Sequence, residues 1–128
     1  MINKKLSLNG LIFKATKIKV SNNILTITLN RPEKKNALNN VMVNEINYAL
    51  AYAKQERGIR VVVIAAEGDI FCAGADLNRT ESDSNVPKLD GAEDISIAIR
   101  HLYKPVICKI QGSVLAGALL MVTNATHA

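Results

Sequence analysis

The stretch Ile70-Phe71-Cys72-Ala73-Gly74-Ala75-Asp76-Leu77 decides the fold expected of this chain. It is a turn of small residues between an apolar, strand-like run and a polar segment that Asp76 is placed to cap as a helix. Since Gly74 and its alanine neighbours have almost no side chains, backbone N–H groups in this turn can approach a ligand closely. The sequence therefore predicts a site built from backbone donors.

The same order of features recurs later in the chain. The first copy covers residues 61–75 and the second covers residues 106–118, and each has an apolar strand, a glycine turn, small residues and a helix start. Two such turns that face one point can hold one oxygen between two backbone N–H groups, which is the arrangement that stabilises an oxyanion in acyl chemistry. The alternative is a pair of ordinary strand-to-helix turns, which α/β proteins contain in numbers.

Other ligand classes have less support in the sequence. Residues 112–117 have the glycine spacing of a P-loop, but Ala118-Leu119 stands where that loop needs its lysine and hydroxyl. No GxGxxG follows a strand-like run, so nothing indicates a dinucleotide site. Cys72 and Cys108 have no His or Cys at metal-ligand spacing, and we expect no metal and two buried free thiols in a reducing compartment. A nucleophilic Cys72 is the alternative, but no histidine can be placed beside it from the sequence.

Three motifs together resemble a known family. They are Asn30-Arg31-Pro32-Glu33-Lys34-Lys35-Asn36-Ala37-Leu38, then Phe71-Cys72-Ala73-Gly74-Ala75-Asp76-Leu77, then Lys104-Pro105-Val106-Ile107 leading to Gln111-Gly112 and Ala116-Gly117. In this order they resemble the N-terminal half of the enoyl-CoA hydratase/isomerase (crotonase) superfamily. The resemblance implies an α/β fold, a crotonase-like spiral of repeated strand–turn–helix units that is apparently truncated at the C-terminus. Residues 1–128 are then the N-terminal part of a single crotonase-like domain.

The resemblance also implies a substrate and a mode of catalysis. The substrate is an acyl-CoA thioester, and the backbone N–H groups of Ala75 and Gly117 form an oxyanion hole for its enolate-like intermediate. The loop with Lys34 and Lys35 borders the adenosine end of coenzyme A, although a solvated loop is the alternative for either lysine. Coenzyme A enters as part of the substrate, so no separate cofactor is expected. The predicted substrate-binding residues are Lys35, Ala37, Leu38, Ala73, Gly74, Asp76 and Leu77.

Acid–base groups are where the chain departs from the family's hydratases. Leu120 occupies the position of the first hydratase glutamate, and the second would lie beyond residue 128. The acidic residues in loops are individually more typical of surface charges; they are Asp69, Glu81, Asp83 and Asp90. Two classes of function stay open: an enzyme of the hydratase, isomerase, hydrolase or decarboxylase type, and an acyl-CoA-binding or assembly protein, or truncated remnant, without competent acid–base groups. Leu120 cannot exchange a proton, so hydration by this chain is expected to be slow.

Composition and charge narrow the class further. The chain has 128 residues and 48% hydrophobic content, which suits one globular domain. Its net charge of +5 fits an anionic small ligand, and no motif indicates nucleic acid. No run approaches the roughly eighteen apolar residues of a membrane span, and the start lacks a signal-peptide core, so a cytoplasmic protein without membrane contact is expected. By resemblance, the full-length protein forms homotrimers or hexamers.

Local patterns predict the order of helices and strands. Residues 24–30 alternate as in a half-buried strand, residues 61–66 read as a strand covered on both faces, and Asn39 and Asp94 precede helical periodicities as N-caps. The expected elements are strands over 11–20 and 24–30 around a hairpin turn, a helix from 39 to 58, a strand over 61–66, a loop over 78–91, a helix from 94 to 103, a strand over 104–111 and a helix over 116–124.

Overall fold

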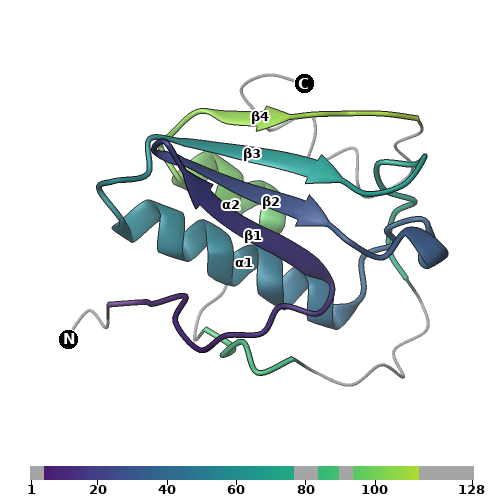
Figure 1. Ribbon diagram of the computed structural model, residues 1–128, viewed down its shortest axis with the longest axis horizontal. Helices are drawn as coiled ribbons and strands as arrows, with labels where there is room; N and C mark the ends of the chain where they lie inside the picture. The colour runs from purple at the N-terminus through teal and green to yellow at the C-terminus, as the bar shows by residue number, and fades with distance from the viewer. Residues whose placement is uncertain (1–4, 77–83, 90–93, 113–128) are drawn as a thin grey trace.

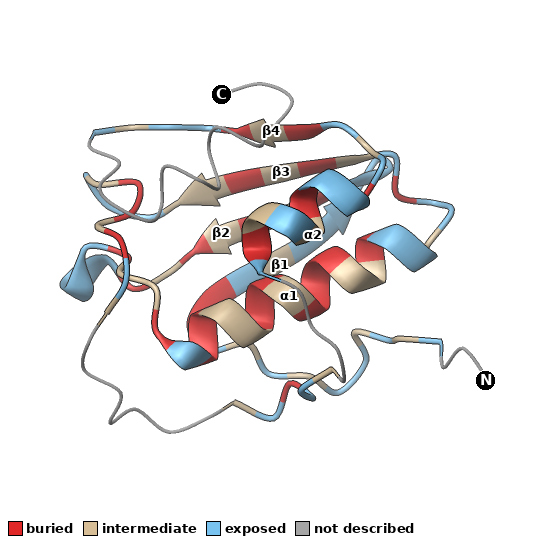
Figure 2. Ribbon diagram, turned by 180° about the vertical axis from the view of Figure 1, so that it is seen from behind, coloured by how far each residue is buried: buried red, intermediate tan, exposed pale blue. Residues whose placement is uncertain are grey.

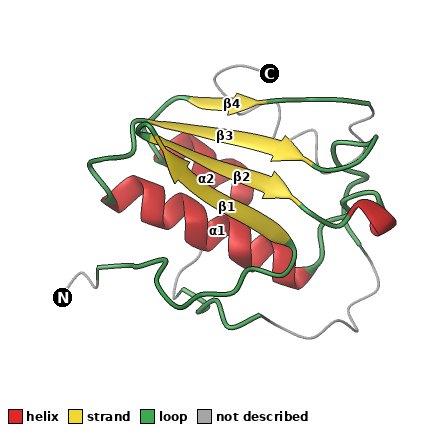
Figure 3. Ribbon diagram, in the orientation of Figure 1, coloured by secondary structure: helices red, strands yellow, loops and turns green. Residues whose placement is uncertain are grey.

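The structure, a computed structural model, describes residues 5–76, 84–89 and 94–112. Its elements are β1 (Thr16–Ser21), β2 (Ile24–Leu29), the 3-10 helix η1 (Pro32–Lys34), α1 (Asn40–Gln55), β3 (Val61–Ala66), α2 (Ile95–His101) and β4 (Val106–Cys108). The strands form one sheet in the order β1-β2-β3-β4, in which β1 is antiparallel to β2 and the other neighbours are parallel. Both α-helices lie on one face of this sheet (Figures 1 and 3). The predicted α/β class is confirmed.

The β1–β2 hairpin forms around the predicted turn. Asn22 and Asn23 both have positive φ, 52° and 67°, which is the backbone of a two-residue hairpin turn with a right-handed twist. Asparagine tolerates this left-handed region better than most residues with side chains. The predicted start of the first strand at Leu11 is wrong, since β1 begins at Thr16. The backbone just before it turns toward α1 and donates hydrogen bonds to Glu45 instead of pairing with β2.

Helix α1 is capped at both ends by side chains. At its start, the Asn39 side-chain oxygen accepts a hydrogen bond from the N–H of Met42 at 2.8 Å, as the sequence predicts. At its end, the Lys104 ammonium donates to the carbonyls of Ala53 in the last turn and of Glu56 just after it. The apolar stripe between the caps is buried; it consists of Val41, Met42, Ile46, Ala49, Leu50 and Ala53.

The strand register brings buried residues into rows across the sheet. One row consists of Leu25, Val62 and Val106, and the next consists of Ile27, Ile64 and Cys108. Only this side of β3 is buried, and its other residues are partly exposed, which Figure 2 shows as alternating bands. The prediction of a strand covered on both faces is therefore wrong for the described part of the chain. The reason is that α1 and α2 both pack on the same face of the sheet.

Helix α2 and strand β4 follow the predicted order with shorter bounds. The Asp94 carboxylate accepts from the N–H of Ser96 at 2.9 Å, so the predicted N-cap is confirmed. The helix ends at His101, ahead of Pro105, whose ring disfavours helix in the residue before it. Strand β4 covers only Val106–Cys108 of the predicted 104–111. The predicted helix over 116–124 and most of the predicted loop over 78–91 lie outside the described residues.

Candidate functional site

Three loops meet at one edge of the sheet. Because β2, β3 and β4 are parallel, their carboxyl ends lie at the same edge, which is where ligands bind in many α/β folds. The loops that leave these ends contain residues 31–39, 67–76 and 109–112 (right side of Figure 1). Both predicted turns therefore start at this edge, and the described part of the first one shows its geometry in detail.

The backbone N–H of Ala75 points away from the neighbouring loop. Leu38 pairs with Ala75 in a parallel bridge: the Leu38 N–H donates to the Gly74 carbonyl at 2.7 Å, and the Asp76 N–H donates to the Leu38 carbonyl at 2.9 Å. In such a bridge the central residue directs its own N–H away from the partner strand. Ala75 is exposed, and within the described residues no acceptor receives its N–H. Within the part of the chain that the structure describes, the Ala75 N–H is therefore a donor without a protein acceptor.

The buried side chain of Asn36 holds the beginning of the first turn. Its amide nitrogen donates to the carbonyls of Glu67 at 2.7 Å and Ile70 at 2.9 Å, and its oxygen accepts from the N–H of Arg31 at 2.8 Å. Asn36 and Lys35 both have left-handed backbones, with φ of 55° and 54°. The Lys35 carbonyl in turn accepts from the Ala73 N–H at 3.0 Å. The loop before α1 is thus bound to the turn along its length.

A nearly buried ion pair completes this attachment. The Arg31 guanidinium lies 3.0 Å from the Asp76 carboxylate, and the two side chains are 3% and 16% exposed. Arg31 also donates to the Ala37 carbonyl. The sequence predicts Asp76 as a helix N-cap, but the helix that it would cap lies outside the residues that the structure describes. The structure shows the Asp76 carboxylate paired with Arg31. The sequence patterns did not predict this role of Arg31. The signal in the sequence was a charged residue directly after a buried strand.

The two cysteines are inert thiols in the core. The Cys72 Sγ donates to the Asn36 carbonyl at 3.1 Å and is fully buried. Burial raises the pKa of this thiol, and a hydrogen bond from the backbone of Gly74 opposes that effect only in part. Burial also raises the pKa of Cys108 to about 11. A protonated, buried thiol is a poor nucleophile, so the structural interpretation of Cys72 is favoured.

The raised pKa of Cys108 predicts a loss of stability at high pH. A thiol in the unfolded chain ionises near pH 9.0 and the folded one near 11, so the stabilisation is complete below pH 9 and is lost as the pH rises toward 11. We expect the free energy of unfolding to fall by about 2 kcal/mol more in the native chain than in Cys108→Ala between pH 8 and 11. Urea titrations at several pH values measure this difference. Parallel pH profiles for the two proteins would contradict it.

The structure brings together the predicted site residues that it describes. Lys35, Ala37 and Leu38 come from the loop before α1, and Ala73, Gly74, Ala75 and Asp76 come from the turn beside it. Leu77, Gly117 and Leu120 lie outside the described residues, as do Glu81, Asp83 and Asp90. Asp69 is exposed on the loop after β3.

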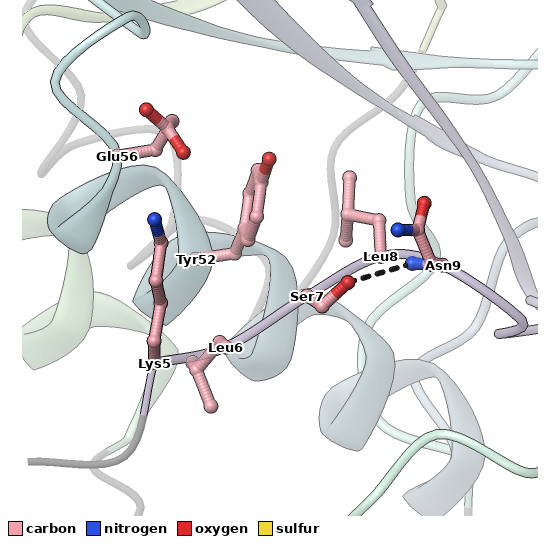
Figure 4. Close-up of a pocket in the computed structure, with 7 residues that line it drawn as sticks. All are labelled: Lys5, Leu6, Ser7, Leu8, Asn9, Tyr52 and Glu56. Carbon is pink, nitrogen blue, oxygen red and sulfur yellow. Dashed lines mark hydrogen bonds between the residues drawn. The ribbon is translucent and has the colours of Figure 1, made fainter.

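Other features of the described residues do not extend this site. They hold no cluster of His, Cys, Asp or Glu side chains suited to a metal ion, and no helix among them is both long and apolar enough to cross a membrane. A shallow hollow of about 380 Å³ lies between residues 5–9 and the end of α1, where Tyr52 of the helix and Glu56 just after it line the hollow (Figure 4). None of the residues that line it belongs to the three loops at the sheet edge.

Comparisons with known proteins converge on one group. The family model described as Enoyl-CoA hydratase/isomerase matches residues 19–126. The chain is 34% identical over 110 residues to a 1,2-epoxyphenylacetyl-CoA isomerase of Escherichia coli strain K12, which aligns 77% of this chain and 40% of that protein. It is 35% identical over 113 residues to a trans-2-decenoyl-[acyl-carrier-protein] isomerase of Streptococcus mutans, with 83% of this chain and 43% of that protein aligned.

A solved structure supports the same grouping. A probable enoyl-CoA hydratase from Mycobacterium smegmatis superposes with a TM-score of 0.72 at 30% identity and covers 88% of this chain. The alignment uses 47% of that protein. The chain therefore spans somewhat less than half the length of the relatives that it matches.

Proposed function

Because the chain belongs to the enoyl-CoA hydratase/isomerase (crotonase) family, we propose that it binds an acyl thioester of coenzyme A and stabilises an oxyanion at the thioester carbonyl. The two donors are the backbone N–H groups of Ala75 and Gly117. The observation that carries the proposal is the direction of the Ala75 N–H, which the bridge to Leu38 turns outward at the carboxyl end of the sheet. Two aligned donors stabilise the negative charge that develops on the oxygen as an enolate forms.

The surroundings of Ala75 suit a thioester. Ala73 and Gly74 have small side chains or none, so a planar acyl group can lie against the turn. Lys35 is exposed on the neighbouring loop, where its ammonium can meet a phosphate of coenzyme A. The names of the two relatives, one a CoA isomerase and one an acyl-carrier-protein isomerase, both denote thioester substrates. We also propose that the protein is cytoplasmic and, by resemblance, that the full-length protein is a homotrimer or hexamer.

A second function is favoured by one residue. Leu120 occupies, by resemblance, the position of a hydratase glutamate and cannot exchange a proton. An acyl-CoA-binding protein without hydratase chemistry is therefore the alternative. Loss of the enoyl absorbance of crotonyl-CoA in the presence of the protein would favour a hydratase. Binding of enoyl-CoA thioesters with neither hydration nor double-bond isomerisation would favour the second function.

Removal of the Ala75 donor tests the proposed site. Ala75→Pro deletes the N–H, and among the described residues that N–H has no acceptor, so no hydrogen bond within that part of the chain is lost. We expect the affinity for butyryl-CoA to fall about tenfold or more, since the carbonyl loses one of its two donors. The ¹³C resonance of a labelled thioester carbonyl should also lose the downfield shift that polarisation in the native site produces.

The matched control is Ala75→Ser, which keeps the N–H and changes only a small side chain. It should retain both the affinity and the carbonyl shift. If Ala75→Pro is folded by circular dichroism and still binds and polarises the thioester like the native protein, the proposed oxyanion hole is wrong.

A further inference from the structure

We propose that Gln111 is a positioning residue that, with Asn36, holds the loop leading to the Ala75 donor in place; the inference rests on the proposed oxyanion hole. Gln111 follows β4, at the start of the second turn, and its side chain reaches back to the first. Its amide nitrogen donates to the carbonyl of Ala66 at 2.6 Å and to that of Gly68 at 3.0 Å. The residue that follows β4 is therefore bonded directly to the loop that leads to Ala75.

Asn36 holds the same loop from another side. Its amide nitrogen donates hydrogen bonds to the carbonyls of Glu67 and Ile70. Along the chain, these two carbonyls alternate with the two that accept from Gln111. Four carbonyls between residues 66 and 70 are thus bound by two side-chain amides. Since each peptide group is planar, fixing a carbonyl also fixes the direction of the N–H in the same peptide.

The fifth carbonyl of this loop, that of Asp69, lies against the backbone of Gly112. A Cβ atom at Gly112 would lie 1.8 Å from the Asp69 oxygen, and Gly112 has a left-handed φ of 66°. Only glycine allows this approach without a shift of one backbone. The start of the second turn is therefore in direct contact with the loop that leads into the first.

The N–H donors of the two side-chain amides are already used within the protein. A side-chain amide has two N–H donors, and in both Gln111 and Asn36 each donor has a backbone carbonyl as partner. Neither amide nitrogen has a donor left for a thioester oxygen. The two side chains instead fix the direction of the backbone around them. An oxyanion hole depends on this, because its donors must point at one position before the charge develops.

Gln111→Met is the direct test, because methionine has a similar length and no donor. The hydrogen exchange of two amide protons near Ala75 measures how firmly Gln111 and Asn36 hold the loop, and it needs no ligand. These are the amide protons of Ala73, bonded to Lys35, and of Asp76, bonded to Leu38. We expect Gln111→Met to speed their hydrogen exchange at least tenfold and to leave the exchange of Ile27 in β2 unchanged. The ¹³C shift of a labelled butyryl-CoA carbonyl on binding should shrink with it.

Two further variants control for general loss of structure. Gln55→Met removes an amide at the far end of α1, where Gln55 accepts from the N–H of Leu6 at 2.9 Å, and should alter neither readout. Gln111→Lys restores donors to the two carbonyls and should recover most of the native exchange rates.

Each outcome decides the inference. Unchanged exchange at Ala73 and Asp76 in Gln111→Met would show that Gln111 does not hold the loop in place. If the amide protons of Ala73 and Asp76 exchange faster but the ¹³C shift of the bound carbonyl stays as large as in the native protein, Gln111 stabilises the loop without positioning the donor. The positioning role would then be wrong. If the native protein itself binds no acyl-CoA, the proposed function fails and the positioning role fails with it, and the absence of any native carbonyl shift identifies this case.

Discussion

Replacing Glu45 by alanine is expected to destabilise the folded chain by about 4 kcal/mol or more. The Glu45 carboxylate has no exposed surface. It accepts hydrogen bonds from the backbone N–H groups of Lys14, Ala15 and Thr16 and from the Thr16 hydroxyl, at 2.8–3.0 Å. Alanine leaves these donors without an acceptor, and each buried donor that loses its partner costs about 1–3 kcal/mol.

A graded series separates these hydrogen bonds. Glu45→Gln keeps one oxygen for Ala15 and Thr16 and loses the acceptor of Lys14, so we expect a loss of about 1–2 kcal/mol. Thr16→Val removes only the hydroxyl donor and should cost about 1 kcal/mol. Urea unfolding followed by circular dichroism measures all three variants. A cost below that of Glu45→Gln for the alanine variant would show that water replaces the carboxylate.

Local signals in the sequence predicted the elements well. The hairpin turn depends on two adjacent asparagines with left-handed backbones, and the helix starts depend on Asn39 and Asp94, whose side chains bond within their own first turns. Such interactions join residues a few positions apart, so the sequence displays both partners together. For the same reason the small-residue turn around Gly74 was recognisable as a place where backbone donors can be exposed.

Interactions between distant residues were not predictable in this way. Glu45 stands within the apolar stripe of α1, which indicates a buried carboxylate, but nothing in the sequence shows that its partners are backbone groups just before β1. This is why the first strand was predicted to start too early. Gln111 and Arg31 likewise act on loops that are remote in sequence, and only the parallel register of the sheet brings them together.

Loss of the Arg31–Asp76 ion pair is the other change expected to have a large effect. Arg31→Met should cost about 3–5 kcal/mol, because it leaves the Asp76 carboxylate largely buried and without the guanidinium at 3.0 Å. An exposed pair in the same protein is the matched control: Lys17 and Glu67 lie 3.2 Å apart, with side chains 60% and 47% exposed. Lys17→Met should cost less than about 1 kcal/mol, since solvent screens that pair.

A double-mutant cycle shows whether this cost belongs to the pair. Asp76→Asn in the Arg31→Met background removes the largely buried charge that the guanidinium no longer faces, so the double variant should be more stable than Arg31→Met alone. The ion pair joins the loop before α1 to the turn that carries Ala75, so acyl-CoA binding should weaken in Arg31→Met and recover in part when the buried charge is removed. Additive costs in the cycle would mean that each side chain stabilises its own loop independently. The attachment of the two loops would then depend on their other contacts, among them the Asn36 amide, the Leu38–Ala75 bridge and the hydrogen bond from Ala73 to Lys35.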